Sequence, residues 1–282
     1  MSGDTAVRGR VMTHGERSTD DSGTHIARVY NALLGGKDNY ESDRAIADEF
    51  TAVAPEFTAL AWDNRQFLMR ASRFLAGEAG ISQFLDFGAC LPVGDSTHEV
   101  VQRLNRNASV VYIGMDPLVL AHGRALLADN DMTHIVDVNW LAPQNVLNDA
   151  AVCKYIDFEQ PVAFCHVGTL MHVPDEYDPW DIMRELIDAS APGSYFAFAH
   201  LLDPGPGHEL AELAARVQDV YLNSPMASGW FRPIDRITEM LPGLDLVEPG
   251  VVPLADWWPD GPRLKPVAPV QRLLVGAVGR KP

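Results

Sequence analysis

The chain has 282 residues, of which 47% are hydrophobic and 21% are charged, a composition typical of a globular protein with a sizeable core. Its 38 acidic and 22 basic side chains give a net charge of −16, which disfavours binding to nucleic acids and anionic membranes and favours a small-molecule partner. The three cysteines are too few and too widely spaced for a disulfide framework, and no apolar run reaches the ~18–20 residues that cross a membrane, so we predict a cytoplasmic location.

Polar residues without an apolar signal core fill the start of the chain, which predicts a disordered tail over residues 1–24. Helical patterns follow over residues 25–79, and Gly35-Gly36 mark the end of the first helix. The three predicted helices cover residues 26–34, 42–53 and 57–79.

Strands and helices alternate over residues 80–282. The predicted strands cover residues 83–87, 109–113, 133–138, 162–167, 195–200, 244–248 and 272–278. The predicted helices cover residues 96–104, 118–129, 143–147, 180–189, 209–221 and 234–240. Because strands joined through helices form right-handed crossovers, this order predicts an α/β domain with a mostly parallel seven-stranded sheet.

The first of these strands ends in Asp86-Phe87-Gly88, which is typical of a nucleotide-type site. Glycine lets the backbone approach a ligand closely, and the turn and the next helix N-terminus present free N–H groups. Methyltransferases that depend on S-adenosylmethionine (SAM) carry a D/E-x-G-x-G motif at this point. Asp86 and Gly88 match it, whereas Cys90 stands in place of the second glycine.

A longer set of motifs resembles one particular family. The most specific block runs Leu-Leu-Gly-Gly-Lys-Asp-Asn over residues 33–39, and further matches extend from about residue 26 to the C-terminus. The chain resembles an actinobacterial family of SAM-dependent methyltransferases long catalogued only as a domain of unknown function. The resemblance implies a Rossmann-like class I SAM methyltransferase fold, SAM as cofactor, and an N-terminal helical lid over residues 25–79.

Three positions in the cofactor-reading loops depart from the family. The family has glycine in place of Cys90, an acid in place of Gly114 and, as a tendency, arginine in place of Asn139. The acid normally holds both ribose hydroxyls, because a carboxylate accepts two hydrogen bonds. Asp116, two residues after Gly114, is a candidate replacement.

The resemblance also implies which residues bind the cofactor. The candidates are Lys37, Asp38, Arg65, Asp86, Gly88, Cys90, Asp116, Asp137 and Val138. Lys37 or Arg65 would bind the carboxylate of the cofactor's methionine end, Asp38 its ammonium, and Asp137 the adenine amino group. Helix capping and surface charge are the alternatives for the acids and for the lid residues.

The candidate catalytic residues are His166, His172 and Tyr30. His166 ends an apolar strand, at the edge where open α/β sheets bind ligands, and a buried structural histidine is the equal alternative. His172 is a candidate general base and Tyr30 a positioning group.

An acceptor pocket needs apolar and aromatic walls, and the candidates for them are Trp257-Trp258 and Trp230-Phe231. The nine histidines show no ligand spacing for a metal site.

These observations favour methyl transfer to a hydroxyl or amine of a small specialised metabolite. The departures at Cys90, Gly114 and Asn139 leave two alternatives: a methyltransferase scaffold that catalyses a cyclisation or rearrangement, and a non-catalytic small-molecule-binding protein. A homodimer is a possible assembly.

Overall fold

The computed structural model describes residues 26–88, 91, 93–127, 130–262 and 265–282. The predicted tail and Cys90 lie outside the described residues.

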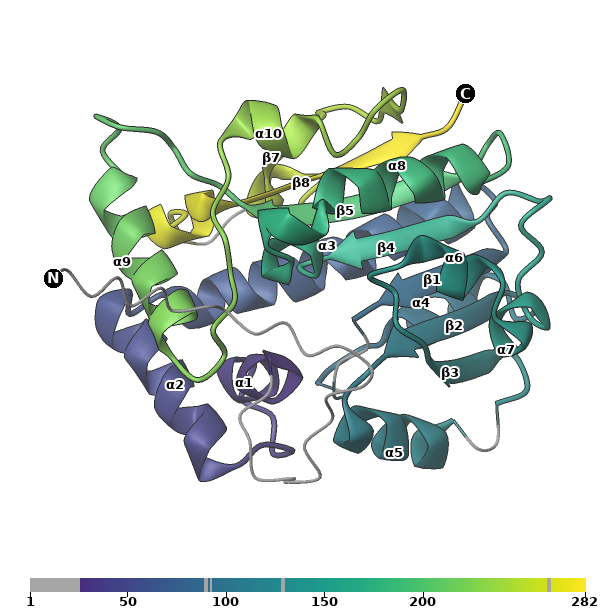
Figure 1. Cartoon of the computed structure of the whole chain (residues 1–282), viewed down its shortest axis with the longest axis horizontal. Coiled ribbons are helices and arrows are strands. Elements are labelled where there is room, and N and C mark those ends of the chain that lie inside the picture. The colour runs from purple at the N-terminus through teal and green to yellow at the C-terminus, as the bar shows by residue number, and fades with distance from the viewer. Residues whose placement is uncertain (1–25, 89–90, 92, 128–129, 263–264) are drawn as a thin grey trace, which may run out of the picture.

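One mixed sheet of eight strands forms the centre of the molecule, in the order β3-β2-β1-β4-β5-β8-β6, with β7 also paired to β8 (Figure 1). The strands are β1 (Gln83–Phe87), β2 (Ser109–Gly114), β3 (Thr133–Asp137), β4 (Ala163–Val167), β5 (Tyr195–Leu201), β6 (Asp245–Leu246), β7 (Val252–Pro253) and β8 (Leu274–Arg280). The first five are parallel and β8 runs antiparallel to β5. The predicted Rossmann-like class I fold is therefore confirmed.

The predicted number of seven strands is wrong by one. The expected strand over 244–248 is only two residues long, because the chain turns after it, with the Gly250 N–H donating to the Val247 carbonyl at 2.9 Å. A second two-residue strand, β7, then pairs with β8 at a separate place.

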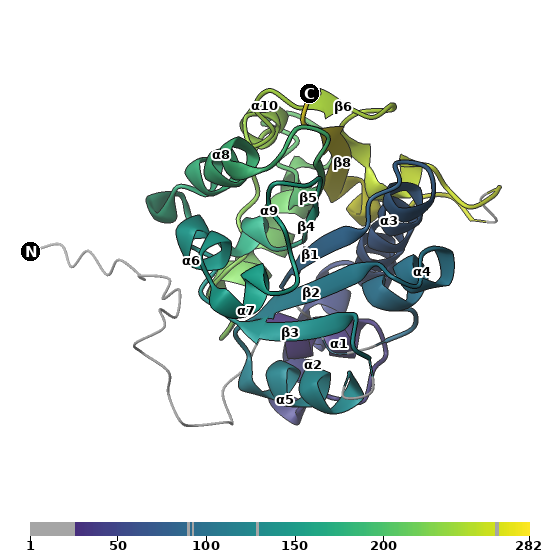
Figure 2. The ribbon, with the colours of Figure 1, turned by 90° about the vertical axis from the view of Figure 1, so that its right-hand side faces the viewer.

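Helices cover both faces of the sheet, and Figure 2 shows α3 and α4 on one side and α6 and α8 on the other. The helices are α1 (Ile26–Leu33), α2 (Glu41–Val53), α3 (Phe57–Gly77), α4 (Thr97–Leu104), α5 (Pro117–Leu126), α6 (Pro143–Leu147), α7 (Ala150–Cys153), α8 (Pro179–Ala189), α9 (Ala211–Asn223) and α10 (Ile234–Thr238). Side chains alternate along each strand, so Phe84 joins the core under α3 while Leu85 joins the core on the opposite face. Within the described residues, no helix is long and apolar enough to cross a membrane.

The N-terminal helices gather at one end of the sheet, where α1 lies beside α2 and α2 lies beside α9 (Figure 1). Aromatic stacking joins these segments. The rings of Phe50 on α2 and Phe57 on α3 stack at 4.4 Å, and Tyr221 on α9 lies 4.5 Å from Phe50. Burial of such rings outweighs helix propensity in holding short helices in place. The long helix α3 connects this cluster to the sheet.

Candidate functional site

A cavity of about 550 Å³ lies where the carboxyl ends of β1, β2 and β4 meet α1, α2, α3 and α9. The order of the strands reverses between β1 and β4, and open α/β sheets bind ligands at such a switch point. The cavity has two parts. We call the part lined by Asp86, Gly88, Gly114 and Asp116 the sheet half, and the part lined by Tyr30, Phe50, Phe57, Tyr221, His172 and Ser228 the aromatic half.

The loop after β1 forms the floor of the sheet half. Asp86 is buried, and Thr97 Oγ1 donates a hydrogen bond to its carboxylate at 2.5 Å. Burial raises the pKa of Asp86 to about 6, while the Thr97 hydrogen bond and the charge of Arg65 act in the opposite direction. Gly88 has φ +75°, and a Cβ there would lie 2.4 Å from Thr169 Cγ2, so only glycine fits this turn.

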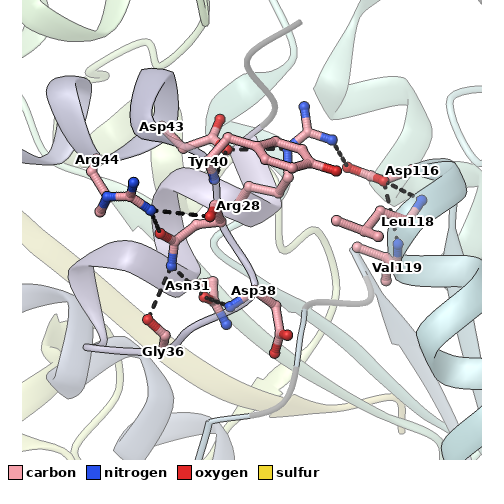
Figure 3. A network of polar contacts seen from close by, with 11 residues as sticks. Arg28, Asn31, Gly36, Asp38, Tyr40, Asp43, Arg44, Asp116, Leu118 and Val119 are labelled. Carbon is pink, nitrogen blue, oxygen red and sulfur yellow. Dashed lines mark hydrogen bonds and ion pairs between the residues drawn. The ribbon is translucent and has the colours of Figure 1, made fainter. Parts of the chain in front are cut away.

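Lys37, Asp38 and Arg65 were the charged residues predicted to bind the methionine end of the cofactor. Only Arg65 lines the cavity. Arg65 is buried, lines the cavity and donates to the Asp95 carbonyl at 2.6 Å. Lys37 is exposed, and neither it nor Asp38 belongs to the described lining. The reason is local: the turn after α1 folds onto Asn31, whose Oδ1 accepts from the Asp38 N–H at 3.1 Å (Figure 3).

The predicted ribose and adenine contacts are only partly at the cavity. Asp116 lines it, caps α5 by accepting from the Leu118 N–H at 2.7 Å, and lies 3.6 Å from Arg28. Asp137 and Val138 are outside the lining, because Val138 turns into the core on the other face of the sheet.

Arg28 is a residue that sequence reasoning missed. It comes from α1, is 4% exposed, and its guanidinium lies between Asp43 of α2 and Asp116 (Figure 3). The Arg28 Nε to Asp43 Oδ2 distance is 3.2 Å, and Asp43 also accepts from the Tyr40 N–H at 2.9 Å. This buried charge network joins α1 and α2 to the start of α5. Its only sequence signal is that Arg28 lies shortly before the specific block over residues 33–39, among the family matches that begin at about residue 26.

The two candidate histidines have different surroundings. His166 is 1% exposed, stacks on Phe87 at 3.9 Å and is not among the lining residues. Its Nδ1 lies 2.9 Å from Thr169 Oγ1, which is typical of a structural histidine. His172 lines the cavity, and its Nδ1 lies 3.0 Å from Ser228 Oγ. His172 rather than His166 is therefore the candidate base.

Tyr30 enters the aromatic half from α1. Its hydroxyl donates to the Ala61 carbonyl at 3.1 Å and accepts from Asn64 Nδ2 at 3.2 Å, so its position over the cavity is fixed from α3. Ser228 was missed from sequence, because an isolated serine carries no pattern of its own.

The predicted tryptophan wall is wrong. Trp257 is fully buried on Phe67, and Trp258 stacks on Trp257 at 4.8 Å, away from the cavity. Trp258 adopts φ +42°, which places its ring against Trp257 at the edge of the core, where it remains 38% exposed. Trp230 and Phe231 also lie outside the described lining.

Burial of His166 has a consequence for stability that can be measured. Desolvation lowers the pKa of His166 to about 3, so the folded chain keeps the ring neutral while the unfolded chain protonates it near its ordinary value of 6.5. The free energy of unfolding should therefore fall as pH falls from about 6.5 to 3, by roughly 1.4 kcal/mol per pH unit for this one ring.

Urea unfolding of the wild type and of His166→Gln between pH 6.5 and 4.5 tests this, with the exposed His208→Gln as the control. A smaller pH slope in His166→Gln alone is expected. Equal slopes in all three proteins would contradict the assignment.

Comparison with known proteins agrees with this geometry. A model of a family described as S-adenosyl methyltransferase matches residues 12–282. A crystal structure described as a "putative methyltransferase" from Thermobifida fusca YX is 41% identical, with a TM-score of 0.86, over 93% of this chain and 96% of that one. A DUF574 family protein from Streptomyces avermitilis MA-4680 is 32% identical, with a TM-score of 0.86, over 93% and 99%. A search of curated proteins found no match.

The residues of the sheet half fit SAM, because a glycine turn without room for a Cβ borders a cavity that presents a buried arginine and a buried carboxylate. SAM carries a zwitterionic end that needs partners of both signs in an enclosed site. The chain belongs to the S-adenosyl methyltransferase family and is a SAM-dependent methyltransferase.

Proposed function

We propose that the chain methylates a hydroxyl or amine of a small specialised metabolite that binds in the aromatic half of the cavity. The observation that carries this proposal is the continuity of the cavity: its lining joins Asp86 and Gly88 at the strand ends to Tyr30, His172 and Ser228 beside the aromatic rings. Cofactor and acceptor can therefore meet without a change of fold.

The side chains have distinct tasks in this proposal. Bound SAM supplies a methyl group on an electrophilic sulfonium. Arg65 holds the carboxylate of its methionine end, and the turn at Gly88 offers backbone donors. His172 takes the proton from the acceptor at Nε2, while Ser228 at Nδ1 orients the ring. Tyr30 positions the acceptor.

The net charge of −16 supports a small-molecule acceptor rather than a nucleic acid. The reaction would take place in the cytoplasm of an actinobacterium. The proposed assembly is a homodimer, which light scattering can test.

Calorimetric titration with SAM, followed by mass spectrometry, tests the proposal. The protein is incubated with SAM and a library of phenols and aromatic amines, and a product heavier by one CH₂ is sought. Methyl transfer is the expected result. SAM binding with a product of unchanged mass would favour the cyclisation or rearrangement alternative, and absence of SAM binding would favour a binding protein.

Arg65→Ala should weaken SAM binding by about ten- to a hundred-fold, because a hydrogen bond to a charged group contributes roughly 1.5–3 kcal/mol. The exposed Arg73→Ala on the same helix is the matched control. Equal affinities for SAM in both variants would show that Arg65 serves only to hold the Asp95 loop.

Gly114→Asp should tighten SAM binding by about ten-fold, because it restores an acid at the end of β2 and a hydrogen bond to a charged group contributes roughly 1.5–3 kcal/mol. Gly261→Asp adds the same charge at an exposed position outside the cavity lining. Calorimetry on both variants is the measurement. An unchanged affinity in Gly114→Asp would mean that Asp116 already supplies the ribose contact.

A further inference from the structure

Charge is distributed unevenly along the cavity. Apart from histidines, the acidic and basic side chains among the described lining residues are Arg65, Asp86 and Asp116. All three belong to the sheet half: Asp86 lies on β1, Asp116 follows β2, and Arg65 bonds to the carbonyl of Asp95 in the loop after β1. The described lining of the aromatic half contains no Asp, Glu, Lys or Arg.

Flat rings form the walls of that uncharged half. Phe50 and Phe57 are stacked with an interplanar angle of 10°, and Tyr221 is tilted by 60° against Phe50. The thioethers of Met171 and Met226 complete the wall. Aromatic rings pack best against other aromatic rings in offset or edge-on arrangements, and thioethers adapt to the same surfaces. The shape and chemistry of this half suit a planar aromatic ligand.

One polar pair stands in the wall, and its geometry is held from several sides. Ser228 Oγ lies 3.0 Å from His172 Nδ1, and the Ser228 N–H donates to the Tyr221 carbonyl at 3.2 Å. Ala227 has φ +46°, a left-handed conformation that is unfavourable for a non-glycine residue, and such strain concentrates at ligand sites. Gly229 lacks room for a Cβ, which would lie 2.4 Å from the Tyr221 ring.

The segment that carries His172 is fixed from the same side. His172 ends a short 3₁₀ turn, η1 (Leu170–His172), and the Trp230 N–H donates to the Met171 carbonyl at 2.8 Å. The buried Arg232 donates to the Val173 carbonyl at 2.7 Å. The His172–Ser228 pair is thus a polar anchor in the wall that backbone hydrogen bonds hold in place.

We propose that the methyl acceptor is an uncharged, planar aromatic molecule whose hydroxyl or amine hydrogen-bonds to His172 and Ser228. That this ligand is the methyl acceptor rests on the proposed function. Its binding can be tested without methyl transfer. An anionic ligand placed in the aromatic half would lose its hydration without meeting a described Lys or Arg side chain, which is strongly unfavourable. A cationic ligand would meet aromatic faces, which attract cations, but no described carboxylate in this half. The test therefore includes a cationic probe.

Four naphthalenes of similar size serve as probes in calorimetric titrations, with and without saturating S-adenosylhomocysteine: 2-naphthol, 2-methylnaphthalene, 2-naphthoate and 2-naphthylmethylammonium. We expect 2-naphthol to bind at least about a hundred-fold more tightly than 2-naphthoate, since burying an unpaired ion costs several kcal/mol. It should bind about five-fold more tightly than 2-methylnaphthalene, which lacks the hydrogen-bond donor.

Ser228→Ala should remove most of the preference for 2-naphthol over 2-methylnaphthalene, and Ser228→Thr should retain it. The exposed Ser42→Ala is the control. Naphthoate or the ammonium probe binding as tightly as 2-naphthol would overturn the proposal, and so would an unchanged preference in Ser228→Ala. If 2-naphthol binds as expected but S-adenosylhomocysteine does not bind, the proposed function fails while the ligand class stands.

Discussion

Replacing Arg28 with alanine should lower the free energy of unfolding by about 3–5 kcal/mol, because it removes the cation between two buried carboxylates. Asp43 and Asp116 are 0% and 2% exposed, and the guanidinium lies 3.2 Å from the first and 3.6 Å from the second. Water cannot replace the lost partner at these depths without opening the contact between α1, α2 and the loop before α5.

Urea unfolding followed by circular dichroism measures this effect. The matched control is Arg184→Ala, whose ion pair with Asp181 is exposed and should contribute no more than about 1 kcal/mol. A triple variant, Arg28→Met with Asp43→Asn and Asp116→Asn, removes the charges together and should recover part of the loss, since asparagine still caps α5. A loss in Arg28→Ala no larger than in Arg184→Ala would show that the network does not hold α1 and α2 to the start of α5.

Replacing His172 with alanine should lower the rate of methyl transfer by about 10²–10⁴-fold, the usual contribution of a positioned general base. The affinity for SAM should stay unchanged, because His172 belongs to the aromatic half and the candidate cofactor contacts belong to the sheet half. The measurement pairs single-turnover kinetics on an identified acceptor with calorimetry for SAM.

The exposed His208→Ala serves as the control for this variant. Ser228→Ala should lower the rate of methyl transfer by less than His172→Ala does. The imidazole ring of His172 is still present in this variant, but the Ser228 hydroxyl that orients it is absent. A His172→Ala enzyme that retains the wild-type rate would place the base elsewhere or show that the acceptor ionises without one.

The sequence was sufficient for the fold and for the floor of the site, because both depend on local patterns. An apolar strand that ends in Asp86-Phe87-Gly88 is readable over a few residues, and the structure places Asp86 and Gly88 at the cavity. Alternation of strands and helices likewise predicted the parallel part of the sheet.

The remainder of the site depends on contacts between distant residues. Phe50 and Tyr221 have the spacing of ordinary helix core residues, and no pattern tells a core ring from a ring beside a cavity. The Lys37-Asp38 pair was assigned to the cofactor from the family resemblance, yet the Asn31 amide holds the Asp38 backbone in a turn outside the lining. Arg28 could be assigned only once α2 and the Asp116 loop were brought to it.

The central claim is that one cavity holds the cofactor in its sheet half and leaves its aromatic half for the acceptor. A crystal structure of the protein with S-adenosylhomocysteine tests this most directly. The account predicts the ligand beside Gly88, with its carboxylate at Arg65 and its sulfur facing the half that contains His172 and Tyr221. Density for the ligand across Phe50 and Tyr221, or with its carboxylate away from Arg65, would contradict the account.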